Sequence, residues 1–63
     1  MEARILRMAE VQKLVGLHKS TIYRLIDANE FPKPIKLGPN SVGWLREEID
    51  KWIATRERVP RER

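Results

Sequence analysis

Residues 14–26 limit what this 63-residue chain can fold into more than any other stretch. Apolar residues recur at helical spacing on both sides of one glycine, at Val11, Leu14 and Val15 before it and at Ile22, Leu25 and Ile26 after it. Gly16 can take the positive φ that a tight turn between helices often needs, and Leu17 lies where it would fill the crevice between them. The pattern predicts a helix-turn-helix, a motif whose second helix enters the major groove of DNA.

The second predicted helix has a polar outer face. Its 3.6-residue period points Ser20, Arg24 and Asp27 outward, with Lys19, Thr21 and Tyr23 beside them. Lysine and arginine can contact phosphates or guanine edges, and hydroxyl groups can bond phosphate oxygens. The same face would also suit an αα-hairpin exposed to solvent. For Asp27 three roles stay open: an ion pair with Arg24, a hydrogen bond from a cytosine amino group, or simple exposure.

The helices can be bounded from the sequence. The first is expected from about residue 9 to 15, and the second follows His18 as N-cap and ends near Ala28, with Asn29 as a left-handed residue. The third is expected over residues 46–57, with Leu45, Ile49, Trp52 and Ile53 on one apolar stripe and a Glu47–Lys51 pair on its surface.

Between the last two helices the pattern changes to that of strands. Phe31-Pro32-Lys33-Pro34 cannot be helical, and Phe31 is expected to fold back over the core. Residues 35–37 and 42–44 flank a Gly-Pro-Asn-Ser turn and predict a β-hairpin, while residues 5–6 are expected as an extended lead-in. We therefore predict a mainly α fold, a winged helix-turn-helix of three helices and a two-stranded wing. It forms one domain over residues 1–63, with a core at about 5–57 and a charged tail at 58–63.

The charge of the chain favours an anionic partner. Thirteen Lys and Arg against nine Asp and Glu give a formal net charge of +4, and much of the excess lies between residues 13 and 36. There is no cysteine for disulfides or thiolate metal sites, no apolar run of the ~20 residues that a membrane span requires, and no signal-type segment at Met1. We expect a cytoplasmic protein that does not associate with membranes.

Catalysis and metal binding are not expected. His18 is the only histidine, so no metal site or cofactor is predicted. Ser20, His18 and Asp27 are the residue types of a catalytic triad, but they would lie on a convex helix face of a chain too small for a substrate pocket. The chain is predicted to bind a partner rather than to act as an enzyme.

The stretch from Leu6 to Ile53 resembles the AlpA family of prophage-encoded regulators, small relatives of phage excisionases and of the MerR-type winged-helix domain. The resemblance rests on Gly16-Leu17, on the run from Ser20 to Ile26, on Phe31-Pro32-Lys33-Pro34 with Ile35-Lys36-Leu37-Gly38, and on Val42-Gly43-Trp44 with Glu48-Ile49-Asp50 and Trp52-Ile53. It implies a sequence-specific DNA-binding transcriptional regulator of a prophage or integrated element. The alternatives are an excisionase-type recombination directionality factor with the same DNA-binding mode, and a protein-interaction module whose exposed helix docks an acidic partner.

The predicted site joins the second helix and the wing. Lys19, Ser20 and Arg24 are expected as central DNA contacts, and Thr21 and Tyr23 as groups that position phosphates. The Tyr23 ring could at the same time cover the core. In the wing we expect contacts from Lys36, Asn40 and Ser41, although the family often carries a basic residue near the last two. The predicted partners are double-stranded DNA and, on it, a second copy of the chain or an integrase. Trp44 and Trp52 are expected in the core rather than stacked on bases.

Overall fold

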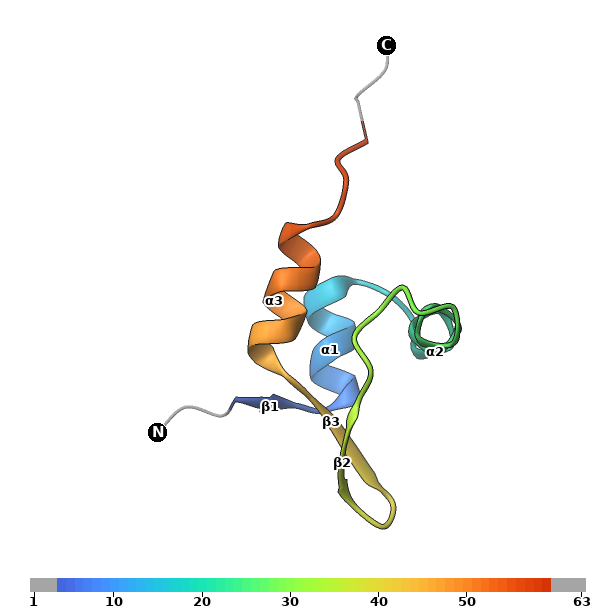
Figure 1. Cartoon of the computed structure of the whole chain (residues 1–63), viewed down its shortest axis with the longest axis vertical. Coiled ribbons are helices and arrows are strands. Elements are labelled where there is room, and N and C mark those ends of the chain that lie inside the picture. Colours follow the sequence, from blue (N-terminus) through green and yellow to red (C-terminus); the bar gives the residue numbers. More distant parts are fainter. Residues whose placement is uncertain (1–3, 60–63) are drawn as a thin grey trace.

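The computed structural model describes residues 4–59 of the chain. In order, these residues form β1 (Ile5–Leu6), α1 (Met8–Val15), α2 (Lys19–Asp27), β2 (Ile35–Gly38), β3 (Ser41–Leu45) and α3 (Arg46–Ala54). In Figure 1 α2 is seen nearly end-on while α1 and α3 run along the page, so α2 crosses them steeply. The β2–β3 hairpin projects from the body of the molecule. The three predicted helices are confirmed, and the fold combines them with a small antiparallel sheet.

The sheet has three strands in the order β1-β3-β2, so the predicted strand count of two is wrong. Ile5 pairs with Leu45 and Leu6 with Trp44, which joins the expected lead-in to the hairpin. β2 pairs with β3 through Ile35 opposite Gly43, with a bulge between Lys36 and Gly38. A strand of two residues carries no alternation that the sequence could reveal, and its partner lies about 40 residues further along the chain.

Gly43 allows the three strands to approach closely. A Cβ at this position would lie 2.6 Å from Cγ2 of Ile5 and 3.0 Å from both Cδ1 of Leu37 and the carbonyl oxygen of Leu6. Because successive side chains of a strand alternate, these groups lie on the face opposite Trp44. The absence of a side chain at Gly43 thus lets Ile5 and Leu37 close over the outer face of the sheet.

All three helices, β1, β3 and the connection after α2 contribute to one small core, whereas β2 has no buried residue. Its buried members are Leu6, Val11, Ile22, Phe31, Trp44 and Ile49. Phe31 does fold back over the core, and Leu17 packs against it from the inter-helix turn, as predicted. Two residues that were predicted on the buried apolar stripes are exposed instead, Leu14 at 41% and Ile53 at 39%. Helices of eight and nine residues offer only about two turns each, so residues at the edge of a stripe reach past the core.

The third helix differs from its prediction at its end and on its surface. It ends at Ala54 rather than Glu57, because the Arg56 N–H donates to the Ile53 carbonyl, three residues back, and so leaves the α-helical pattern. The Thr55 hydroxyl and Arg56 Nε donate to the Trp52 carbonyl. The surface pair that forms within α3 is Arg46–Asp50, at 3.6 Å, while Glu47 pairs with Arg4 instead of Lys51. These pairs are exposed and each contributes about 0.2–1 kcal/mol at most. In the predicted charged tail, residues 58 and 59 are exposed and residues 60–63 lie outside the described part.

Candidate nucleic-acid interface

The turn between α1 and α2 contains the left-handed glycine that the sequence predicted. α1 ends at Gly16, which has φ 72° and donates its N–H to the Gln12 carbonyl at 2.8 Å. A left-handed residue at this place satisfies a carbonyl at the helix end, and glycine adopts it without steric cost. α2 begins at Lys19, three residues after Gly16. The short turn fixes the direction in which α2 leaves α1.

His18 caps α2 with its imidazole ring. Its backbone is extended (φ −73°, ψ 154°), and its Nδ1 accepts the backbone N–H of Ser20 at 3.2 Å. The Ser20 hydroxyl lies 3.0 Å from the same nitrogen. An accepting Nδ1 carries no proton, so the neutral ring bears its proton on Nε2. The predicted N-cap position is confirmed, and the ring takes the role that serine or asparagine usually has there.

The other end of α2 closes in a Schellman motif. Asn29 has φ 61°, as predicted, and donates its N–H to the Ile26 carbonyl at 3.0 Å. Glu30 donates its N–H to the Leu25 carbonyl at 2.8 Å. This pair of bonds satisfies the last carbonyls of the helix. Specific hydrogen bonds therefore terminate both ends of the nine-residue helix α2, which stabilises its first and last turns.

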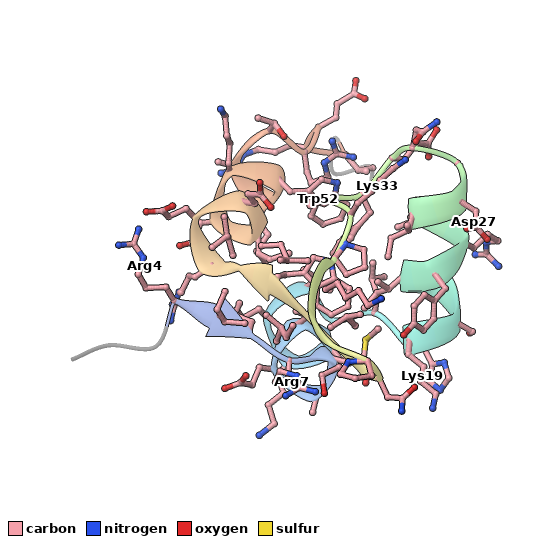
Figure 2. All side chains as sticks on the ribbon, turned by 60° about the horizontal axis from the view of Figure 1, so that its bottom comes forward. Arg4, Arg7, Lys19, Asp27, Lys33 and Trp52 are labelled. Atoms are coloured by element: carbon pink, nitrogen blue, oxygen red, sulfur yellow. The ribbon has the colours of Figure 1, made fainter. Side chains whose placement is uncertain are left out.

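The outer face of α2 is exposed along its full length. Ile22 is completely buried and Leu25 and Ile26 are half-buried, which directs the polar residues away from the body. The exposed residues of the helix are Lys19, Ser20, Tyr23, Arg24 and Asp27. Figure 2 shows Lys19 and Asp27 near opposite ends of α2, with Asp27 directed away from the rest of the molecule. The outward placement that the helical period predicted is confirmed for these side chains.

The two residues predicted to position phosphates, Thr21 and Tyr23, differ in their exposure. Thr21 is half-buried and does not belong to the outer row. Tyr23 is 46% exposed and belongs to the exposed face of α2. Tyr23 therefore remains a candidate contact, whereas Thr21 can offer only its hydroxyl from the margin of the face.

The remaining predicted residues lie on the β2–β3 hairpin, which we call the wing. Lys36 is exposed on β2 and opposes Val42 of β3. Asn40 is exposed in the turn, and Ser41, half-buried, begins β3. The predicted contacts thus form two groups, one on α2 and one on the wing, joined by residues 28–34.

The cations of these two groups take no part in the ion pairs of the described chain. Between residues 4 and 59 those pairs are Arg4–Glu47, which joins the residue before β1 to α3, and Arg46–Asp50, which lies within α3. Lys19, Arg24 and Lys36 are exposed and unpaired within this part of the molecule. Their charge is available to an external anion.

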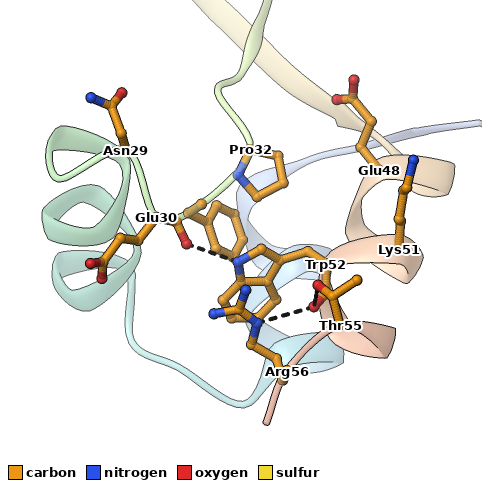
Figure 3. A pocket seen from close by; sticks show the side chains of 9 residues that line it. Asn29, Glu30, Pro32, Glu48, Lys51, Trp52, Thr55 and Arg56 are labelled. Carbon is orange, nitrogen blue, oxygen red and sulfur yellow. Dashed lines mark hydrogen bonds between the residues drawn. The ribbon is translucent and has the colours of Figure 1, made fainter.

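A second surface feature lies between the end of α2 and α3. It is an open hollow of about 490 Å³, lined by Asn29, Glu30, Phe31, Pro32, Glu48, Lys51, Trp52, Thr55 and Arg56 (Figure 3). Trp52 is half-buried there, meets Phe31 edge-on at 4.7 Å, and carries the Arg56 guanidinium 4.5 Å above its ring. Trp44 is fully buried and Trp52 packs against the core, so both act in the body of the protein as predicted.

Some site-related features were not predicted. Lys33 is exposed in the connection between α2 and the wing, and only its charge in the sequence marked it. The indole N–H groups of Trp52 and Trp44 donate to the carbonyls of Glu30 and Pro32. No local pattern could reveal these bonds, because they join residues 22 and 12 positions apart.

The described residues, 4–59, contain neither a metal-binding cluster nor a membrane-spanning helix. No group of three or more His, Cys, Asp or Glu residues is placed to hold a metal ion. No helix among these residues has the length and apolar character needed to cross a membrane.

Comparison with known proteins identifies relatives along nearly the whole chain. Protein ORF88 of Enterobacteria phage P4, described as uncharacterized, is 47% identical over 55 residues, covering 87% of this chain and 62% of that protein. The DNA-binding transcriptional activator AlpA of Escherichia coli K12 is 39% identical over 59 residues, covering 84% of each protein. No solved structure gave a significant match. The family model of the prophage CP4-57 regulatory protein (AlpA) matches residues 4–57, and the chain therefore belongs to the AlpA family.

Proposed function

We propose that this protein is a sequence-specific DNA-binding transcriptional regulator of a prophage or integrated element. In this proposal the fold works as a winged helix-turn-helix, with α2 in the major groove and the wing on the flanking backbone or in the minor groove. The protein acts in the cytoplasm and has no catalytic role. Its family membership and the name of the E. coli relative support DNA as the partner.

The exposed, unpaired cationic face of α2 is the observation that carries the proposal. An α-helix with its side chains is about 10–12 Å in diameter, which matches a major groove about 12 Å wide, and the nine residues of α2 give it a length of about 13.5 Å. Lys19 begins this helix, and its first turn holds no acidic side chain. No negative side chain in that turn offsets the positive end of the helix dipole, which therefore adds to the charge of Lys19.

Each contact group has a role that follows from its chemistry. Arg24 has a planar guanidinium that can bond two acceptors of a guanine or clamp a phosphate. Lys19, Ser20 and Tyr23 can contact phosphate oxygens beside it. Lys36 and Asn40 would extend the contact to the neighbouring backbone through the wing. A second copy on an adjacent site, or an integrase, is a further partner that this proposal allows.

The test begins by selecting duplexes from a random-sequence pool with the protein itself. Binding of the selected duplex and of a scrambled duplex is then measured by fluorescence anisotropy over a range of salt concentrations. We expect the selected duplex to bind about 10³-fold or more tightly, and log K to fall steeply with log salt. A pool that shows no enrichment, together with equal affinity for all duplexes, would reject sequence-specific binding. A protein-interaction module would show neither enrichment nor a steep salt slope.

A further inference from the structure

Residues 28–34 connect α2 to the wing, and three consecutive residues within this connection, 30–32, contact the body of the protein. The Glu30 carbonyl accepts a hydrogen bond from Trp52 Nε1 at 2.8 Å, and the Pro32 carbonyl accepts one from Trp44 Nε1 at 2.9 Å. Between them Phe31 is 5% exposed and packs edge-on against Trp52. We call residues 30–32 the anchored segment. Figure 3 shows the first of these bonds at the hollow beside α3.

The anchored segment lies immediately next to the two proposed DNA-binding elements. Glu30 belongs to the Schellman motif of α2, so the bond from Trp52 is made to the residue that terminates the helix. β2 begins at Ile35, three residues after Pro32. Pro32 and Pro34 fix φ in this short connection. A rotation of α2 relative to the wing would therefore have to break a bond to one of the two indoles.

The donor at Trp52 is itself held in place. The Arg56 guanidinium covers its ring at 4.5 Å, and Arg56 Nε and the Thr55 hydroxyl donate to its carbonyl at 3.2 and 3.0 Å. An apolar ring would serve the core equally well, whereas an indole N–H aimed at a carbonyl adds a direction to the contact. Two indoles on different elements, β3 and α3, hold one short segment from two sides.

We propose that the indole N–H groups of Trp52 and Trp44 are positioning groups that set α2 and the wing at the angle required for simultaneous contact with DNA. This inference rests on the proposed function. When α2 and the wing are held at a fixed angle, binding loses little conformational entropy. When they are loosely joined, ordering them lowers the affinity. The loss falls on specific binding, because nonspecific contact with phosphates tolerates many orientations.

The test replaces Trp52 by phenylalanine, which keeps an aromatic ring beside Phe31 and removes the N–H donor. Ile53→Ala is the matched control, since Ile53 is the next residue of α3, is 39% exposed, and has no bond to the anchored segment. In Trp52→Phe we expect the affinity for the selected duplex to fall about two- to tenfold, the range of one hydrogen bond, while the affinity for the scrambled duplex stays constant. Faster amide exchange at residues 28–31 and 33 by NMR should accompany this loss. Ile53→Ala should keep the parental ratio of the affinities for the selected and scrambled duplexes, even if its Tm falls as much as that of Trp52→Phe.

A synthetic chain with benzothienylalanine at position 52 covers the case in which Trp52→Phe does not fold. Its sulfur replaces the N–H in a ring of nearly the same shape, so the same fall in the affinity ratio is expected. A parent that discriminates between the duplexes, combined with an unchanged ratio in the folded variant, would refute this inference alone. A parent that does not discriminate would refute the proposed function and this inference together.

Discussion

Replacing Arg24 by alanine should weaken DNA binding while leaving the fold intact. Arg24 is exposed, and no ion pair of residues 4–59 involves it, so its removal takes no contact from the core. The substitution removes a positive charge that favours the last turn of α2, and it introduces alanine, which has a higher helix propensity. These two effects on stability are each a few tenths of a kcal/mol and oppose each other. We expect the free energy of unfolding to change by less than about 0.5 kcal/mol, as for most surface substitutions. For a domain of this size the Tm should then shift by less than about 4 °C.

The loss in DNA affinity depends on what the guanidinium touches. A bidentate contact to guanine contributes about 1–3 kcal/mol, so its loss would weaken the selected duplex about 5- to 150-fold and relax discrimination at one base pair. A phosphate contact would weaken all duplexes alike and reduce the salt slope by about 0.9. Arg24→Lys separates these cases, because lysine keeps the charge but lacks the planar fork.

The assay is anisotropy on selected and scrambled duplexes at several salt concentrations, with thermal unfolding followed by circular dichroism. Arg46→Ala is the matched control, because it removes the same charge from α3, where the guanidinium pairs with Asp50. We expect this control to bind nearly as the parent does. If a folded Arg24→Ala binds both duplexes like the parent, α2 is not the recognition helix and the proposed binding mode is wrong.

Four further changes test the core, the sheet, the cap and the wing. Trp44→Ala should cost about 3–5 kcal/mol, because the side chain is fully buried, and an unchanged Tm would contradict its place in the core. Gly43→Ala should cost about 1–3 kcal/mol in urea unfolding, since the new Cβ would lie 3.0 Å from the Leu6 carbonyl oxygen; parental stability would show that the sheet relaxes freely. His18→Ala should lose about 1 kcal/mol of stability through the missing cap, and His18→Asn should restore it. Shortening residues 38–41 to a minimal turn should reduce DNA affinity at constant Tm, and equal affinity would remove the wing from the site.

The elements that depend on local pattern could be predicted from the sequence. The apolar spacing around Gly16 indicated both helices of the helix-turn-helix, and Gly16 and Asn29 have the positive φ values expected of them. The Gly-Pro-Asn-Ser turn located the hairpin to within one residue at each strand end. In each case the signal and the structure it specifies lie within a few residues of one another.

Features that depend on distant residues could not be predicted in the same way. Ile5 pairs with Leu45, and Trp52 donates to the Glu30 carbonyl. Each contact joins residues that are distant in the sequence, and no local sequence pattern relates them. The early end of α3 follows from the change to an i→i−3 bond at Arg56, where helix propensity alone would allow another turn. Which α2 residues face outward was predictable, because that follows from the period. Which of them touch DNA stays a prediction.

The structure of α2 combines two requirements that ordinarily conflict. A helix that reads DNA must leave most of its surface exposed, and here Ile22 is the fully buried residue of the nine. So little burial gives weak attachment to the core, since a helix of this length depends on tertiary packing for its stability. The hydrogen bonds at both ends compensate, with His18 closing the start and the Schellman motif closing the end. The Trp52 indole then links that end to α3. If α2 reads DNA as proposed, Lys19, Tyr23, Arg24 and Asp27 on the exposed face could vary with the target sequence, because the bonds that hold the helix ends involve other side chains.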